Sequence, residues 1–216
     1  MKKIMFNDRY GLTEAVLSGR KTQTRRVVSE SLWDKWTEYD DFCGSVGVRG
    51  LSEIGVAVTR EYSDCEKFFL DNSPFKVGEV VAVAQSYYDI DLSTFVFACI
   101  DKGMSKKDFA DIVTNSRGCT NKMFVRADLM PHQIRITDVR VERLQDISDE
   151  DCMAEGVYIL DEDPMNPQAY IYTFPNSPEV YYHPREAYAA LIDKISGKGT
   201  FESNPYVFIY EFELIK

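Results

Sequence analysis

Cationic and hydroxyl side chains concentrated near the N-terminus are the part of the sequence best suited to chemistry. Residues 19–26 read Gly-Arg-Lys-Thr-Gln-Thr-Arg-Arg, which puts four cations within the seven residues 20–26. Like charges repel, so such a segment is costly unless an anionic group lies nearby. The pattern suits a phosphate cradle, an RNA contact or a catalytic lysine. The alternative without a function is a solvated run of charge between a helix and a strand, with Arg20 and Lys21 near the helix C-terminus.

The composition limits the kind of ligand that such a segment can serve. The 216 residues include 35 acidic and 25 basic ones, for a formal charge of −10. A protein that coats nucleic acid non-specifically is normally basic, because Lys and Arg make the phosphate contacts. A nucleic-acid role must therefore be local, in a small basic cleft. With 44% apolar and 28% charged residues, the chain is neither disordered, collagenous nor a coiled coil, and its length suits a single domain.

Cysteine and histidine usage argues against a metal or disulfide framework. The five cysteines have no C-x-x-C spacing, and no apolar stretch has the length of a signal peptide or a membrane span. We therefore expect a cytoplasmic protein with free, buried thiols and no membrane partner. His132 and His183 are the only histidines and lie about fifty residues apart, so we expect them in loops or at the surface and predict neither a metal nor a cofactor. Nucleotide-binding, serine-hydrolase and zinc-protease signatures are absent.

The apolar pattern predicts short strands with three or four helices between them, an α+β class. Strands are expected at residues 3–6, 27–28, 80–85, 95–100, 123–127, 134–144 and 206–214, with a strand-like patch at 54–59. Helices are expected at 11–20, 105–113, 146–155 and from Pro184 to Gly197, with a short one near 33–42. Ser105 and Ser148 are expected helix caps, and a change of apolar phase predicts a β-bulge near Thr137. Residues 161–182 are expected to form a long loop, and the last strand to be half-buried.

Several segments together resemble the ASCH domain family of the PUA-like superfamily, in its phage and bacterial form. The family signature, Gly-x-Lys-x-x-(Thr or Glu)-x-Arg, is filled by Gly19, Lys21, Thr24 and Arg26. Residues 75–79 are similar to the family's turn before a central strand, and residues 134–156 to its long middle block. Asn-Pro-Tyr-Val-Phe at 204–208 resembles the family's Asn-Pro-Trp-Val-Trp ending.

The resemblance implies a single PUA-like β-barrel over residues 1–216, with flanking helices and insertions at about 29–73 and 161–182. It implies a cleft that binds RNA, a nucleotide or a modified nucleoside. One small bacterial branch hydrolyses N-acetylcytidine with a Lys, a Thr three residues on, and a Glu on a later helix. Lys21 and Thr24 match the first two residues. Glu155 matches the third through the spacing Leu-x-x-Ile-Ser that begins at Leu144.

The chemistry of such a site follows from its residue types. A partly buried Lys21 beside two arginines has a lowered pKa and can take a proton from Thr24, while Glu155 orients the lysine or passes the proton on. Arg25 or Arg26 can stabilise an oxyanion or hold a phosphate.

Four further side chains are predicted to join the ligand site, and they are Lys122, Arg126, Asn204 and Tyr206. Ala84-Gln85 replaces the Arg-Glu that related sequences often carry after the central strand, so the predicted cleft lacks one family carboxylate. Two functions remain open, a binding module for RNA or a nucleotide, and an amidohydrolase of an acylated nucleoside. An accessory protein with an unidentified partner is a third option. DNA is not among the predicted ligands.

Overall fold

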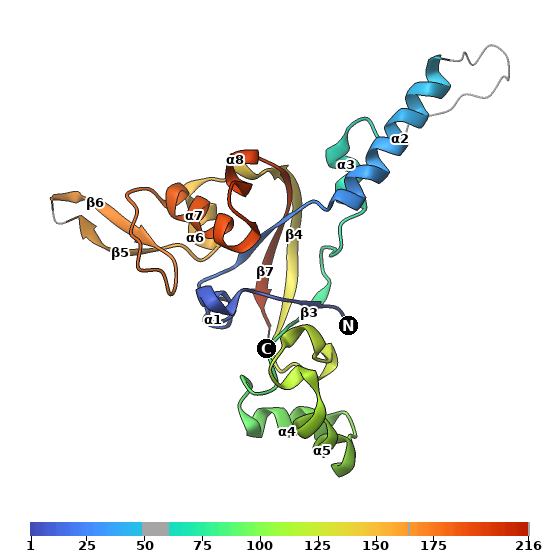
Figure 1. Cartoon of the computed structure of the whole chain (residues 1–216), viewed down its shortest axis with the longest axis vertical. Coiled ribbons are helices and arrows are strands. Elements are labelled where there is room, and N and C mark those ends of the chain that lie inside the picture. The colour runs from blue at the N-terminus through green and yellow to red at the C-terminus, as the bar shows by residue number, and fades with distance from the viewer. Residues whose placement is uncertain (49–60, 164, 216) are drawn as a thin grey trace.

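The computed structural model describes residues 1–48, 61–163 and 165–215. Helices and a hairpin extend outward from one central sheet (Figure 1). The sheet has five strands in the order β1-β3-β4-β7-β2. Their bounds are Lys3–Ile4, Val80–Val83, Gln133–Arg143, Tyr206–Leu214 and Gln23–Val27 in that spatial order. Only β1 and β3 pair in parallel, and the other neighbours are antiparallel. A mixed α+β architecture is thus confirmed.

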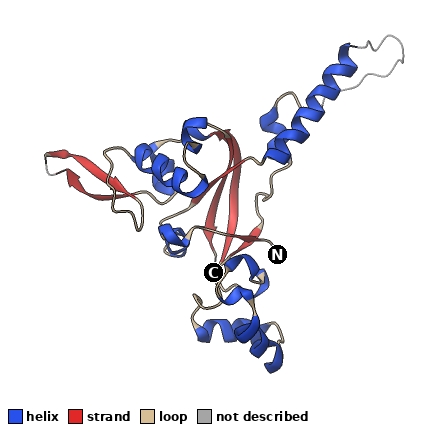
Figure 2. Ribbon diagram, viewed as in Figure 1, coloured by secondary structure: helices blue, strands red, loops and turns tan. Residues whose placement is uncertain are grey.

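Helices surround the sheet and form two outlying lobes in the described part of the chain (Figure 2). Short helix α1 (Leu12–Leu17) lies near the N-terminus, and α6 (Asp149–Ala154), α7 (Pro184–Ser196) and α8 (Thr200–Ser203) gather beside β7. One lobe is formed by α2 (Glu30–Val48) and α3 (Cys65–Asp71), the other by α4 (Leu92–Asp101) and α5 (Lys106–Asn115). No described helix is long and apolar enough to cross a membrane.

Strand β7 is buried on both faces over residues 207–210. Successive side chains of a strand point to opposite faces, so the two sets pack against different parts of the protein. Phe208, Tyr210 and Phe212 pack into the main apolar cluster with the N-terminal segment. Val207 and Ile209 pack into a second cluster with residues of α6 and α7. The expectation of a half-buried last strand fails over residues 207–210, where helices cover the second face. It holds farther along the strand, where the side chains of Glu211 and Glu213 are 40% and 54% exposed.

Several local predictions are confirmed in detail. The register of β4 against β7 shifts between Ile136 and Asp138, where the change of apolar phase predicts a bulge. Ser105 and Ser148 cap α5 and α6, each accepting a hydrogen bond from the backbone N–H three residues on. Helix α1 is followed by Gly19 in the left-handed conformation (φ 74°), where glycine is favoured.

Three predicted segments have a different structure. Residues 95–100 lie in helix α4, which buries Phe95 and Cys99, one turn apart. Residues 123–127 form parts of the 3₁₀ turns Lys122–Phe124 and Ala127–Leu129. The expected loop at 161–182 contributes instead to a hairpin of β5 (Tyr158–Asp163) and β6 (Asn166–Thr173). The short helix near 33–42 is the middle of the 19-residue α2, and the patch at 54–59 lies outside the described residues.

The basic segment is itself a strand at the border of the sheet. Strand β2 begins at Gln23, four residues before the predicted start, and pairs with β7 alone.

Candidate functional site

A cavity of about 330 Å³ lies at the unpaired edge of β2, between α7 and the N-terminal segment. Its polar lining comes mainly from residues 21–26 and from Glu155, and its apolar lining from α7 and the N-terminal segment. The lining residues are Phe6, Asn7, Leu12, Lys21, Thr24, Arg25, Arg26, Val27, Glu155, Tyr188, Leu191, Ile192, Ile195, Ser196, Thr200, Ser203 and Pro205. Its volume falls within the usual range for small-molecule sites.

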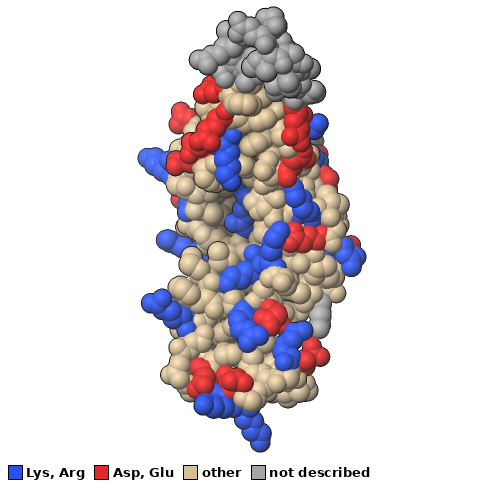
Figure 3. Space-filling view, turned by 90° about the vertical axis from the view of Figure 1, so that its right-hand side faces the viewer, with Lys and Arg blue, Asp and Glu red and all other residues tan. Residues whose placement is uncertain are grey.

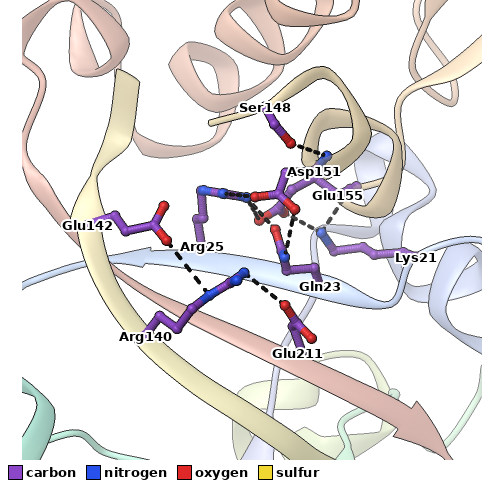
Figure 4. Close-up of polar contacts among 9 residues, drawn as sticks. All are labelled: Lys21, Gln23, Arg25, Arg140, Glu142, Ser148, Asp151, Glu155 and Glu211. Carbon is purple, nitrogen blue, oxygen red and sulfur yellow. Dashed lines mark hydrogen bonds and ion pairs between the residues drawn. The ribbon is translucent and has the colours of Figure 1, made fainter. Parts of the chain in front are cut away.

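Lys21 and Glu155 form a buried ion pair at the centre of this site (Figure 4). Lys21 Nζ lies 2.5 Å from Glu155 Oε2 and donates to the Glu155 backbone oxygen at 2.8 Å. The two residues are 2% and 4% exposed. Glu155 ends α6, and the turn is completed by Gly156 with φ 108°, a conformation that favours glycine. The N–H of Thr22 donates to the Ala154 oxygen and ties the segment before β2 to the end of α6.

Arg25 extends the network toward the start of α6 (Figure 4). Arg25 Nη2 lies 2.6 Å from Asp151 Oδ2. Arg25 Nη1 lies 3.5 Å from Glu155 Oε1 and also donates to Gln23 Oε1. Gln23 Nε2 in turn donates to Asp151 Oδ1 at 3.1 Å. The same Asp151 is fixed by its backbone N–H, which donates to the Ser148 cap. Two cations and two carboxylates are therefore held together inside the protein.

Burial and neighbouring charges shift the proton affinities of this network. Burial lowers the pKa of Lys21, and Arg26 and Arg25 lower it further, against the opposing effect of Glu155, so the net shift is downward. Burial alone lowers the pKa of Arg25, but Glu155 and Asp151 raise it above its ordinary value. Burial raises the pKa of Asp151, yet its bond to Arg25 brings the net shift below the ordinary value. Lys21 thus gives up its proton more readily than a lysine in water.

Thr24 reaches the cavity from the opposite face of the strand. In the register of β2 with β7, Thr24 pairs with Tyr210 and Arg25 pairs with Ile209, so the two side chains point to different faces. Thr24 is 4% exposed, and among the described residues its hydroxyl makes no hydrogen bond. An unbonded hydroxyl and a buried Lys–Glu pair therefore line one cavity, while the catalytic roles of Lys21, Thr24 and Glu155 stay predictions.

Arg26 differs from the other two cations of the lining. Its Nη2 donates to the Met5 backbone oxygen, and its guanidinium lies over the Phe6 ring at 5.7 Å. Within the described part of the chain it has no carboxylate partner. Burial lowers the pKa of Arg26. The three cations of the lining thus face two carboxylates, Glu155 and Asp151, which leaves one positive charge.

The other four predicted ligand residues lie outside the lining of the cavity. Lys122 pairs with Asp8 at 2.6 Å, and Arg126 is bound to Asp128 at 2.7 Å. Asn204 accepts a hydrogen bond from a backbone N–H in a turn, and Tyr206 stacks under the Arg143 guanidinium at 3.8 Å. Their side chains are bonded elsewhere, and none of them lines the cavity beside Lys21.

Three residues of the site or its network are absent from the sequence predictions. Gln23 and Asp151 connect Arg25 to α6, and only the nearby Ser148 cap points to the position of Asp151. Tyr188 lies within the helix predicted from Pro184 to Gly197 but is not among the predicted site residues, and it is 1% exposed. No sequence signal shows that its hydroxyl lacks a hydrogen-bond partner among the described residues.

Comparison of the chain with protein-family models, curated proteins and solved structures finds no match. Among the described residues, no group of three or more His, Cys, Asp or Glu side chains is placed to hold a metal ion. Cys152, behind the network, is fully buried, and burial raises its pKa to about 12. A thiol with so high a pKa is a poor nucleophile, so it packs as an apolar residue. The groups available for chemistry are therefore Lys21, Thr24, Glu155 and the two arginines.

Proposed function

We propose that the chain is an ASCH-type protein whose cavity hydrolyses the amide bond of an acylated nucleoside such as N-acetylcytidine. One observation carries the proposal, the buried contact of Lys21 with Glu155. The resemblance implies that these two residues act together, and they are 134 positions apart in the sequence. Their contact lies in a cavity that also contains the hydroxyl of Thr24.

In the proposed reaction Thr24 is the nucleophile and Lys21 is the base. The Lys21 ammonium first passes a proton to Glu155, which returns it at the end of the cycle. The neutral amine of Lys21 then takes the proton of Thr24 while Thr24 Oγ1 bonds to the amide carbon and the carbonyl electrons move to oxygen. As the C–N bond breaks, the Lys21 ammonium gives its proton to the leaving amine. Water then attacks the acyl-Thr24 ester, its proton passes through Lys21 to Thr24, and the carboxylic acid leaves. Glu155 holds Lys21 in place throughout.

The shape and charge of the cavity support a small, largely uncharged ligand. Its volume of about 330 Å³ suits a nucleoside better than a folded RNA. Leu191, Ile192 and Ile195 give it an apolar wall opposite the charged network. Lys21 and Arg25 are already paired with carboxylates, so they are poorly suited to binding several phosphates.

A second candidate function is the binding of a nucleotide or an RNA strand without chemistry. Arg26 favours it, because this cation also lines a second groove of about 430 Å³ together with Lys3 and Lys35. Phe75, which is partly exposed, lies in the same groove and offers a ring face to a base. Figure 3 shows Lys and Arg side chains gathered over the middle of one face of this acidic protein.

We also propose that the central sheet belongs to a PUA-like barrel. The support is the mostly antiparallel pairing of long strands β4 and β7, and the position of α6 and α7 beside the edge of β2. That edge is where the resemblance implies the cleft.

A panel of ligands separates the two functions. The wild-type protein is incubated with N-acetylcytidine, and release of cytidine and acetate is followed by chromatography. Binding of cytidine monophosphate and a short single-stranded RNA is measured by calorimetry. We expect hydrolysis, its loss in Thr24→Ala and its partial recovery in Thr24→Ser. Hydrolysis undiminished in Thr24→Ala contradicts the nucleophile, and RNA binding without any hydrolysis supports the second candidate.

A further inference from the structure

Two residues that line the cavity each carry a buried hydrogen-bond donor with no acceptor among the described residues. These donors are the hydroxyl of Tyr188 and the Nε–H of Arg25. The other two nitrogens of Arg25 are bonded to Asp151, Gln23 and Glu155, so Nε is the one that is left. Native proteins pair nearly all buried polar groups, since a buried donor without an acceptor costs free energy.

Both donors belong to the site of the Lys21–Glu155 pair. Tyr188 comes from the middle of α7 and Arg25 from β2, and both line the cavity. Electrostatic interaction links Tyr188 with Arg25 and with Glu155. Burial, followed by the charge of Glu155, raises the pKa of Tyr188 well above its ordinary value, so the hydroxyl keeps its proton and acts as a donor. An arginine keeps its protons as well.

These two donors define the kind of acceptor that a ligand must supply. Each needs an oxygen or nitrogen with a lone pair, and a carbonyl oxygen can accept two hydrogen bonds at once. In amide hydrolysis this oxygen becomes negative in the transition state, where fixed donors stabilise it most.

We propose that Tyr188 and Arg25 donate together to the carbonyl oxygen of the bound ligand and form the oxyanion site of the reaction. This inference rests on the proposed function and names the part of the substrate that the site recognises, an amide or ring carbonyl. It assigns a role to Tyr188, which the resemblance does not.

The test compares Tyr188→Phe with Tyr210→Phe, a second buried tyrosine whose hydroxyl is bonded to Ser73 at 2.9 Å. With N-acetylcytidine as substrate, we expect Tyr188→Phe to lower kcat by about 10²–10³-fold with little change in KM, as for the loss of one oxyanion donor. Tyr210→Phe should keep the wild-type kcat. An unchanged kcat in Tyr188→Phe overturns the inference, and is the result expected if an ordered water satisfies the hydroxyl.

Denaturant unfolding gives an independent readout. Tyr188→Phe removes an unpaired hydroxyl and should leave the midpoint unchanged or higher, whereas Tyr210→Phe removes a made bond and should lower it. A fall of the midpoint in Tyr188→Phe as large as that in Tyr210→Phe shows that the hydroxyl is bonded within the protein and contradicts the inference.

Calorimetry separates this inference from the proposed function. If the wild-type protein releases no product, the proposed function fails, and cytidine, which has a ring carbonyl, serves as the probe. Tyr188→Phe should then bind cytidine about tenfold more weakly than the wild type, as for the loss of one hydrogen bond. Equal affinities, or no binding of cytidine to the wild type, overturn the inference.

Discussion

Two clusters of charged residues lie on the same face of the central sheet and differ in burial (Figure 4). The buried cluster contains Lys21, Gln23, Arg25, Asp151 and Glu155. The exposed cluster contains Asp138, Arg140, Glu142 and Glu211. Gln23 pairs with Glu211 across β2 and β7, and Glu211 pairs with Asp138 across β7 and β4, which puts both clusters on one face.

The difference in burial separates a functional arrangement from a solvated one. The side chains of Arg140 and Glu211 are each 40% exposed and meet at 2.8 Å. Those of Lys21 and Arg25 are 1% and 0% exposed. Exposed pairs contribute little to stability, and buried pairs are costly to desolvate and often no better than apolar packing. A buried network beside a cavity therefore argues for a function that needs those charges.

The largest effect on stability is expected from Glu155→Gln. This change removes the anion beside a fully buried Lys21 and also weakens the surroundings of Arg25. We expect the free energy of unfolding to fall by about 3–5 kcal/mol, as when one partner of a buried ion pair is lost. Equilibrium denaturation with urea measures it.

The control removes the partner cation as well. In the double variant Lys21→Met with Glu155→Gln, no ammonium is left without an anion, so the loss of stability should be smaller than in Glu155→Gln alone. A double variant that loses as much as the sum of the two single variants shows that the residues are not coupled.

A smaller and pH-dependent effect is expected from Asp151→Asn, which removes the partner of Arg25 whose side chain is 26% exposed. We expect a loss of about 1.5 kcal/mol at neutral pH, as for a hydrogen bond to a charged group. Because the folded-state pKa of Asp151 is lowered, its contribution is complete above the ordinary value of 3.8 and is lost as the pH falls through the folded-state pKa. Unfolding curves of the two proteins should therefore differ at neutral pH and converge as the pH falls below 3.8 toward the folded-state pKa of Asp151. A constant difference at all pH values contradicts this sign.

The sequence predicts the elements around the site better than those of the outlying lobes. The resemblance implies that Lys21 and Glu155 meet in one cleft, whereas the residues themselves predict only local features such as the Ser148 cap of α6, because a cap depends on nearby residues. Residues 95–100 are an apolar run too short to distinguish a strand from a helix, and their helix packs on a local cluster that the pattern does not show. The hydroxyl of Tyr188 has no sequence signal, since its lack of a partner depends on which residues α7 packs against.

The smallest effect is expected in the exposed cluster. Arg140→Gln removes its pairs with Glu211, Asp138 and Glu142, whose side chains are 31–45% exposed. The free energy of unfolding should change by about 0.5 kcal/mol or less, and hydrolysis of N-acetylcytidine should not change. A loss of several kcal/mol, or of turnover, would show that the two clusters work as one.

Turnover by Lys21→Arg tests the central claim most directly. Arginine keeps the positive charge beside Glu155 but does not release its proton, so it cannot act as a base. With N-acetylcytidine as substrate, and circular dichroism to confirm folding, the account predicts no release of cytidine by Lys21→Arg and rapid release by the wild type. If Lys21→Arg still binds a nucleotide or RNA, the variant has lost the base but kept the positive charge. Wild-type rates of hydrolysis in Lys21→Arg would contradict the role of Lys21 as the base and, with it, the assignment of this cavity as an amidohydrolase site.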